Sequence, residues 1–430
     1  MTLLNTAEAD FMTRFAALLK RGTSDMDNVI RSVTETLNDV KTNGDRALIN
    51  AVCKFDRWKP KNAADLIVGK ETIDKAWDDT PIELQRALAL AYERIRSFHE
   101  KQLPKSWIDF DKNASMLGQK VTPVDRAGLY IPGGKASYPS SLLMNAIPAI
   151  VAGVEEIVVC VPAPNNALSA IVLAAAHICG IERLFKVGGA SAIGAMAYGT
   201  ETIPKVNVIT GPGNIFVATA KKLVFGEVNI DMVAGPSEIG IIADASANAE
   251  LIAIDLLSQA EHDEMASSIL ITNDESVARA ANHAVDRLLQ QLNRKAIAQQ
   301  SIDRRGAIIV SKSIDEAIDL MNQIAPEHLE ILTANPHALL GQIKHAGAIF
   351  LGNYTPEAIG DYVAGPNHTL PTGGTAKFFS PLGVENFMKR SSIIALTAAT
   401  FNDLAQSCAA LANSEELEAH KLSVANRIGL

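Results

Sequence analysis

Short runs rich in valine and isoleucine alternate with alanine-rich stretches from residue 157 to residue 223, and this alternation constrains the fold more than any other feature of the chain. The apolar runs have the length of buried strands, and the alanine-rich stretches have the length of helices. Strands are expected at 157–161, 184–187 and 206–209, and helices at 166–180, 191–198 and 214–223. A strand–helix–strand rhythm normally gives a parallel sheet covered by helices. We therefore predict an α/β domain in this region.

The same rhythm returns in a second series between residues 239 and 351. Strands are expected at 239–242, 268–271, 307–310, 329–332 and 347–351, and helices at 248–262, 274–292 and 313–324. Upstream of both series, residues 26–55 and 72–100 carry apolar residues at helical spacing among charges. The sequence predicts an α/β protein with two tandem Rossmann-like parallel-sheet domains and small helical extensions at the N- and C-termini. The residues beyond Val384 are expected to be helical.

Length and composition favour a soluble enzyme of more than one domain. A chain of 430 residues exceeds the size at which one hydrophobic core normally keeps growing. The net charge is −9 and there is no long run of lysine or arginine, which argues against nucleic acid and anionic membranes as partners. The 4 cysteines are far apart, and residues 1–20 carry acidic side chains without a long apolar stretch. We therefore expect no disulfide framework, signal peptide or membrane span, and a cytoplasmic protein.

Four glycine-rich turns occur where expected strands end. They are Tyr130-Ile-Pro-Gly-Gly134, Val187-Gly-Gly-Ala-Ser191, Thr210-Gly-Pro-Gly-Asn214 and Ala234-Gly-Pro-Ser-Glu238. Glycine at the carboxyl end of a parallel strand lets backbone N–H groups approach phosphate oxygens. Any one of these turns could serve only to reverse the chain, but the four together favour a cofactor cleft. The usual dinucleotide fingerprint Gly-x-Gly-x-x-Gly and the phosphate loop with Gly-Lys-Ser/Thr are both lacking.

Gln259 and His262 are the first candidates for a metal site. Residues three apart share a helix face, so an amide oxygen and an imidazole nitrogen would point toward one position. Asp361, His368 and His420 lie downstream in polar or glycine- and proline-rich surroundings and could complete the site. On spacing alone, such a pair is more often a solvated face, or a histidine favoured near a helix C-terminus. The other motifs raise the weight of the metal interpretation.

The adjacent pair Glu327 and His328 is a candidate for proton transfer. A carboxylate and an imidazole side by side can serve as bases for a water molecule and for an alcohol. Because Pro326 ends the preceding helix, the pair could instead be an exposed entry to a strand.

The motifs also occur in a specific combination. The Tyr130-Ile-Pro-Gly-Gly-Lys135 and Glu327–His328 segments are followed by Gly360-Asp361-Tyr-Val-Ala-Gly365-Pro-Asn-His368 and by Glu415…His420. In their order and spacing, from about residue 25 to the C-terminus, these motifs closely resemble those of the histidinol dehydrogenases. In that family a glutamine, a histidine, an aspartate and a C-terminal histidine bind one zinc ion. The resemblance implies that the matching metal ligands here are Gln259, His262, Asp361 and His420.

The resemblance implies roles for further residues. Glu327 and His328 would be the catalytic pair, and NAD would contact Tyr130 and Asn214. The residues implied to bind the substrate are Ser237, Gln259, His262, His328, Asp361, His368, Glu415 and His420. At one position the chain departs from the family, because Ser191 stands where a longer glutamine commonly contacts the cofactor.

The implied reaction is the oxidation of L-histidinol to L-histidine through bound L-histidinaldehyde, with two NAD⁺ and one zinc ion per subunit. A related dehydrogenase for another small diol or amino alcohol, such as sulfopropanediol, is the main alternative. Glu415 favours histidinol, because a carboxylate attracts a basic imidazole and repels a sulfonate. A silent binding protein is a second alternative, and it would have no need of Glu327 and His328.

The resemblance also implies a homodimer with shared active sites, in which Glu415 and His420 of one chain reach the site of the other. The expected domains are an N-terminal helical extension (1–24), a first α/β domain with the metal and catalytic residues (25–133 with 238–380), a second α/β domain on the cofactor side (134–237) and a C-terminal helical dimerisation tail (381–430).

Overall fold

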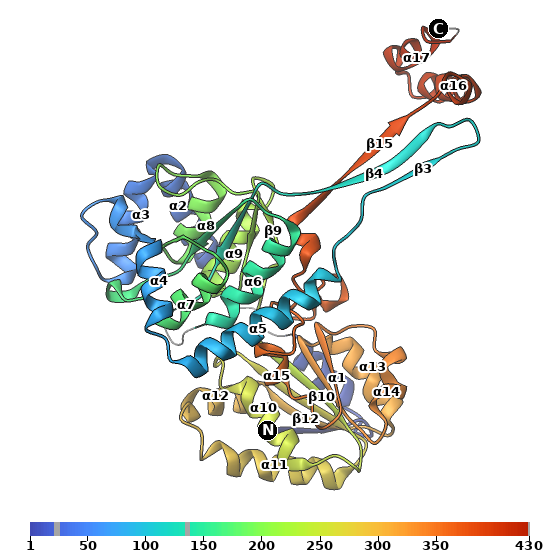
Figure 1. Ribbon diagram of the computed structural model, residues 1–430. Helices are drawn as coiled ribbons and strands as arrows, with labels where there is room; N and C mark the ends of the chain where they lie inside the picture. Colours follow the sequence, from blue (N-terminus) through green and yellow to red (C-terminus); the bar gives the residue numbers. More distant parts are fainter. Residues whose placement is uncertain (21–25, 134–137, 429–430) are drawn as a thin grey trace. The chain divides into compact units, whose positions relative to one another are not determined.

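The computed structural model describes residues 1–20, 26–133 and 138–428, which divide into two compact units (Figure 1). The large unit contains Met1–Gln102 and Asp125–Phe387, and the small unit contains Leu103–Val124 and Met388–Leu430. Two six-stranded sheets lie in the large unit, and a three-stranded sheet lies in the small unit. Within the described residues, no helix has both the length and the apolar character needed to span a bilayer.

The first sheet of the large unit is built mostly from the middle of the chain. Its strands, from edge to edge, are β2 (Ile67–Gly69), β7 (Arg183–Phe185), β6 (Glu156–Cys160), β5 (Arg126–Tyr130), β8 (Val208–Thr210) and β9 (Asn229–Ile230). All neighbours pair in parallel except β2, which is antiparallel to β7. From β5, the next strands β6 and β7 extend the sheet in one direction, and β8 and β9 extend it in the other. This reversal between β5 and β8 is the arrangement of a doubly wound nucleotide-binding sheet.

Helices cover both faces of the first sheet. On one face lie α2 (Met26–Asn43), α3 (Asp45–Ala51), α8 (Gly189–Tyr198) and α9 (Ile215–Val224), whose apolar residues share a core with β6 and β8. The other helices are α4 (Lys70–Asp78), α5 (Ile82–Glu100), α6 (Pro139–Ala152) and α7 (Ala170–Ile178), which pack against one another. Alanine recurs in α6, α7 and α8, with glycine also in α8, and these small residues let the helices approach their neighbours closely.

The second sheet of the large unit is parallel throughout. Its strands, from edge to edge, are β1 (Thr2–Asn5), β12 (Gly306–Val310), β11 (Ser267–Thr272), β10 (Glu238–Ala243), β13 (His328–Leu332) and β14 (Ala348–Leu351). One face is covered by α10 (Ala249–Ala260), α11 (Glu275–Leu289) and α12 (Lys295–Arg305), and the other by α1 (Phe11–Leu19) and α13 (Ile314–Ile324) (Figure 1). Counted from β10, the order again reverses at the centre of the sheet, between β10 and β13.

Short helices connect these elements. They are α14 (Pro336–Leu339), α15 (Glu357–Tyr362), a π-helix at Val52–Asp56 and 3₁₀ turns at Ala63–Leu66, Pro164–Asn166, Leu340–Gln342, Thr375–Lys377 and Val384–Phe387. Of these, α15 carries residues of the candidate site.

The small unit is an antiparallel sheet with two helices. Its strands are β3 (Trp107–Phe110), β4 (Met116–Pro123) and β15 (Met388–Ala395), and its helices are α16 (Ala398–Ser414) and α17 (Glu418–Ala425). The turn between β3 and β4 contacts the start of α16, where the hydroxyl of Thr400 donates to the carboxylate of Asp111 at 2.8 Å. Among the described residues of this unit, the only buried apolar side chains are those of Ala405 and Ala412. The unit therefore has almost no core of its own.

The predicted α/β fold with parallel sheets is confirmed, but several boundaries differ. The assignment of 25–133 to the domain of 238–380 is wrong for strand pairing, because β2 and β5 pair in the first sheet with strands from 156 onward. The expected N-terminal helical extension begins with a strand, β1, at the edge of the second sheet. The expected C-terminal helical tail likewise begins with a strand, β15, which pairs with β4. These pairings join distant residues, so local sequence patterns did not predict them.

Two further differences concern helices. The expected helix 26–55 is interrupted at Gly44, whose φ of +49° separates α2 from α3. The helix predicted for 248–262 ends at Ala260, so His262 lies in the turn that follows it. The 24/25 boundary of the expected extension, together with Gly134 and Lys135 of the motif that begins at Tyr130, lies outside the described residues.

The placement of β1 predicts a sharp difference between two neighbouring leucines. Leu4 is 2% exposed and packs in the core of the second sheet, whereas Leu3 is 53% exposed. Leu4→Ala should lower the free energy of unfolding by roughly 2–5 kcal/mol, and Leu3→Ala by less than about 0.5 kcal/mol. Denaturant unfolding of both variants measures the difference. Equal losses would mean that residues 2–5 do not pack as an edge strand.

Candidate active site

The candidate catalytic pair lies at the centre of the second sheet, at the amino ends of two neighbouring strands. His328 is the first residue of β13, and it pairs in register with Ile239 of β10. Its Nδ1 donates to the backbone carbonyl of Glu238 at 3.2 Å, since a carbonyl oxygen can only accept. The Nε2 atom of His328 is therefore the one that can accept a proton.

Glu327 is fixed next to His328 by the main chain of β10. Its carboxylate accepts from the N–H of Glu238 at 3.0 Å and lies 3.8 Å from Nδ1 of His328. Both side chains are buried, so the alternative of an exposed strand entry is wrong. Burial raises the pKa of Glu327 to about 8, although the charge of His328 opposes the rise.

Three carboxylates surround the imidazole of His328. The distance from Nδ1 to Glu357 is 3.9 Å, and the distance from Nε2 to Asp361 is 3.4 Å. Burial alone would lower the pKa of His328, but the charges of Glu357, Glu327 and Asp361 together raise it well above the usual value. The region carries more negative than positive charge and can therefore bind a cation.

A group of side chains that could bind a metal ion lies next to His328 and includes two of these carboxylates. One ligand atom from each of His262, Glu357 and Asp361 lies within 4.8 Å of the others. His262 is exposed, Glu357 is buried and Asp361 is partly buried, so the group can be reached from solvent on one side. Imidazole nitrogen and carboxylate oxygen form a suitable ligand set for zinc and similar divalent ions.

Gln259 faces this group from the last turn of α10 and is completely buried. In one orientation its amide nitrogen donates to Glu357, while its oxygen accepts from the N–H of Glu238 at 2.8 Å. In the other orientation its oxygen faces the carboxylate of Glu357, and the two oxygens would repel each other unless a cation lay between them. The turn after α10 keeps His262 close, because the N–H of His262 bonds to the carbonyl of Gln259 at 3.2 Å.

The sequence patterns did not point to Glu357, which is the largest addition to the site. It is the first residue of α15, and Asp361 lies four residues later. Residues four apart share a helix face, so the spacing Glu-x-x-x-Asp was the available signal. The glycine- and proline-rich surroundings of Asp361 do not indicate a helix, and the signal was therefore missed.

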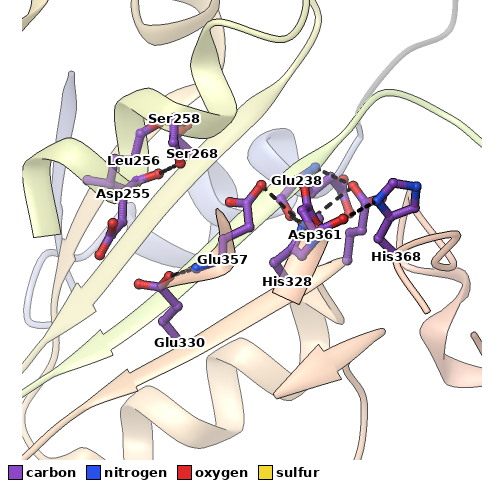
Figure 2. Close-up of polar contacts among 11 residues, drawn as sticks. Glu238, Asp255, Leu256, Ser258, Ser268, His328, Glu330, Glu357, Asp361 and His368 are labelled. Atoms are coloured by element: carbon purple, nitrogen blue, oxygen red, sulfur yellow. Dashed lines mark hydrogen bonds and ion pairs between the residues drawn. The ribbon is translucent and has the colours of Figure 1, made fainter. Parts of the chain in front are cut away.

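Asp361 also connects to His368. The Nδ1 of His368 donates to the backbone carbonyl of Asp361 at 3.0 Å (Figure 2). Burial lowers the pKa of His368, so its neutral form is favoured.

Ser237, the residue before β10, is partly buried, and its backbone carbonyl accepts from the N–H of Ser267 at 2.9 Å. The structure thus brings Ser237, Glu327 and His328 to one edge of the second sheet.

Behind the metal-competent group, two more carboxyl groups form a buried pair. Glu330 on β13 accepts from the N–H of Glu357 at 2.8 Å (Figure 2), and its carboxyl group lies beside that of Asp255 on α10, where the two can share a hydrogen bond. Two carboxyl groups can form such a bond only if one keeps its proton. Burial, with the charges of Asp255 and Glu357, raises the pKa of Glu330 to about 9, and burial raises the pKa of Asp255 to about 6. The pair holds the start of α15 against the sheet.

The candidate cofactor residues lie at the carboxyl edge of the first sheet. Tyr130 ends β5, is buried, and its hydroxyl accepts from the N–H of Gly189 at 3.2 Å. Burial raises the pKa of Tyr130 to about 12, so the hydroxyl stays protonated. Asn214 is exposed at the N-terminus of α9, where its side-chain oxygen accepts from the N–H groups of Phe216 and Val217 at 3.1 and 3.2 Å. Its amide nitrogen remains available for a ligand.

Glu415 and His420 belong to the small unit. Glu415 is the residue that follows α16, His420 lies on α17, and both are exposed there. Of the residues implied to bind metal or substrate, the large unit thus brings together Gln259, His262, His328 and Asp361, with Ser237 and His368 close by.

Comparison with known proteins shows the family to which this chain belongs. The sequence model of the histidinol dehydrogenase family matches residues 19–428. The chain belongs to the histidinol dehydrogenase family. It is 60% identical over 425 residues to the histidinol dehydrogenase of Wolinella succinogenes, covering 99% of this chain and 98% of the relative. The identity to the enzyme of Sulfurimonas denitrificans is 58% over 428 residues, with 100% of both chains covered.

A solved structure supports the same conclusion. The crystal structure of histidinol dehydrogenase from Elizabethkingia anophelis has a TM-score of 0.92 and 36% sequence identity, and the match covers 100% of this chain and 98% of that chain. The protein is therefore an enzyme, an oxidoreductase with the fold of the histidinol dehydrogenases.

The buried pair Asp255–Glu330 predicts how stability depends on pH. The carboxyl of Glu330 ionises near its ordinary pKa of 4.5 when unfolded but has a pKa of about 9 when folded. The unfolded chain binds fewer protons between these values, so this group lowers the free energy of unfolding as pH rises from about 5 to about 9. Glu330→Gln keeps both hydrogen bonds without a charge and should be more stable than the natural protein at pH 8, by roughly 1–3 kcal/mol.

Denaturant unfolding at pH 5, 7 and 8 measures this difference. The control is Glu93→Gln, which removes an exposed carboxylate from α5 and should leave the pH dependence unchanged. A Glu330→Gln protein that loses stability at pH 8 would show that Glu330 is ionised in the folded state.

Proposed function

We propose that this enzyme oxidises L-histidinol to L-histidine with two molecules of NAD⁺ and one bound zinc ion. The observation that carries the proposal is the buried pair of Glu327 and His328 beside the group of His262, Glu357 and Asp361. Oxidising a primary alcohol to an acid removes four electrons. Two hydrides must therefore leave in turn, and water must add between the two steps.

His328 is the proposed base for both hydride transfers, and a bound cation would favour its neutral form by offsetting the carboxylates that raise its pKa. Its Nδ1–H is held by the carbonyl of Glu238, so its Nε2 faces the reacting group and takes the proton from the alcohol oxygen as hydride leaves the carbon. The aldehyde that forms stays bound. As water adds, Nε2 returns this proton to the aldehyde oxygen, and it then accepts a proton from the hydrated aldehyde as the second hydride leaves.

Glu327 is the proposed base for water. Its carboxylate removes a proton while the water oxygen bonds to the aldehyde carbon. Burial raises the pKa of Glu327 to about 8, and this value supports the role because a base works best when its pKa lies near the working pH. The N–H of Glu238 holds the carboxylate in place during this step.

The residues present fit a divalent metal ion. Gln259, His262 and Asp361 are the proposed ligands in the large unit, and Glu357 adds an oxygen beside them. The amide of Gln259 faces this group, and its oxygen is a donor atom that divalent ions accept. When bound, the ion supplies a fixed positive charge that holds the donor atoms of the substrate and offsets the carboxylates around His328.

NAD⁺ is proposed to bind at the carboxyl edge of the first sheet. Three glycine turns meet there: Gly133 and Gly188 both lie against Pro162, and Gly211 lies against the backbone of Tyr130. Residues 231–237 connect this edge to the amino edge of the second sheet, and so short a segment spans at most about 25 Å. A dinucleotide of extended shape can therefore reach from Asn214 to His328.

We propose a homodimer in which the small unit packs on a second copy of the chain. Its exposed apolar side chains include Trp107 at 52%, Ile394 at 70% and Leu411 at 66%. A monomer would leave this surface in water, which is unusual for a stable soluble protein. In the dimer, Glu415 and His420 of each chain would complete the site of the other, with His420 as the fourth metal ligand and Glu415 facing the imidazole of the substrate.

The proposed division of roles predicts a stoichiometry and two different mutant effects. The enzyme should reduce two NAD⁺ per L-histidinol and release no free aldehyde. Glu327→Gln should slow oxidation of L-histidinaldehyde by about 10²–10⁴-fold and oxidation of the alcohol much less, whereas His328→Gln should slow both by about 10²–10⁴-fold. NADH absorbance in single turnovers with each substrate measures these rates. His345→Gln, a change outside the site, is the control.

One NADH per histidinol would contradict the proposal, and so would equal effects of Glu327→Gln on the two steps.

The shared site predicts complementation between two inactive variants. His262→Asn and His420→Asn should each lose bound metal and activity. After subunit exchange, a heterodimer of the two has one intact site of two, so roughly half of the natural activity per heterodimer should return. Activity, metal content and mass spectrometry of the mixed dimers test this expectation.

The control is a mixture of His262→Asn with Asp361→Asn. Both defects lie in the same large unit, so every site keeps one defect and no activity should return. If subunits exchange but activity returns in neither mixture, all the ligands of a site come from one chain.

A further inference from the structure

Outside the candidate active site, the large unit contains a buried ion pair between Lys221 of α9 and Asp231, the residue after β9. Of the ion pairs that lysine or arginine forms in the described part of the chain, it is the only one with both side chains buried, at 2% and 0% exposure. Such pairs contribute little net stability, because removing two charges from water costs about as much as their attraction returns. Their presence calls for another explanation.

The pair holds both backbone groups of one residue, Gly211. The ammonium of Lys221 donates to the carbonyl of Gly211 at 2.9 Å, and the carboxylate of Asp231 accepts from the N–H of Gly211, also at 2.9 Å. The other oxygen of Asp231 contacts Lys221 and accepts from the N–H of Met232 at 2.6 Å. Apart from the contact between the two side chains, these hydrogen bonds of the pair all go to main-chain atoms.

Gly211 occupies a position where the backbone has little freedom. Its φ is +117°, and a Cβ atom there would lie 2.0 Å from the carbonyl oxygen of Tyr130. It follows β8 directly, beside the end of β5, where the strand order of the first sheet reverses. The chain then reaches Asn214, which caps α9. A glycine in such a conformation needs hydrogen bonds from other residues to keep its backbone in one conformation.

We propose that Lys221 and Asp231 are positioning residues for the dinucleotide: they fix the backbone from Gly211 to Asn214 in the geometry that binds NAD⁺. The inference rests on the proposed function, because it takes the carboxyl edge of the first sheet as the NAD⁺ site. Without the pair, the loop has to be ordered when the cofactor binds, and this ordering weakens binding. Metal and histidinol sites lie on the second sheet and are unaffected.

The test is the double variant Lys221→Met/Asp231→Asn, which removes both charges but keeps similar volumes and an acceptor for the N–H of Gly211. Calorimetric titration with NAD⁺ should give a dissociation constant about 10-fold above that of the natural protein. The KM for NAD⁺ should rise likewise, while the KM for L-histidinol and the metal content stay unchanged. Lys221→Arg, which keeps the charge and the donors, should bind NAD⁺ nearly as well as the natural protein.

The matched control is Lys75→Met/Asp79→Asn, which removes an ion pair exposed to solvent on α4 and should leave NAD⁺ binding unchanged. If the double variant at positions 221 and 231 binds NAD⁺ within about twofold of the natural protein, the inference is wrong. It is also wrong if that variant loses its fold in circular dichroism, because the pair would then serve stability. Failure of the natural protein to bind NAD⁺ would instead overturn the proposed function.

Discussion

The concentration of buried negative charge around His328 is the constraint on which the rest of the site depends. Glu327, Glu357 and Asp361 lie within 4 Å of its imidazole, in a region from which most water is excluded. Carboxylates so close together repel one another unless protons or cations separate them. The raised pKa of Glu327, the raised pKa of His328 and the proposed metal ion are three consequences of this one arrangement. In the proposed site, proton transfer and metal binding would therefore be coupled.

The two sheets of the large unit have the same strand order but use opposite edges. The glycine turns follow the carboxyl ends of β5, β7 and β8, as is usual for nucleotide-binding sheets, whereas the candidate catalytic pair lies at the amino ends of β10 and β13. The short connection from β9 to β10 joins these two edges. If NAD⁺ binds at the first sheet and the substrate at the second, as proposed, each sheet supplies one part of the reaction.

The small unit shows what happens when an element cannot bury its own apolar surface. Its sheet and two helices have a core of little more than Ala405 and Ala412, while large apolar residues remain exposed. Such a unit gains stability only by packing on another surface. Placing a metal ligand, His420, on this unit would make catalysis depend on assembly, because an isolated chain would lack a complete site.

The sequence by itself determined the α/β rhythm, the spacing of Gln259 and His262 and the pairing of Glu327 with His328, because all of these are local patterns. It also determined the family, through the order of its motifs. The tertiary structure decided that β1, β2 and β5 join sheets built from distant residues, that Glu357 faces the site and that the pair Asp255–Glu330 lies behind it. These depend on long-range packing, which brings together side chains that no local spacing relates. The bond of Lys221 and Asp231 to Gly211 likewise arises only when β8, α9 and β9 are folded together.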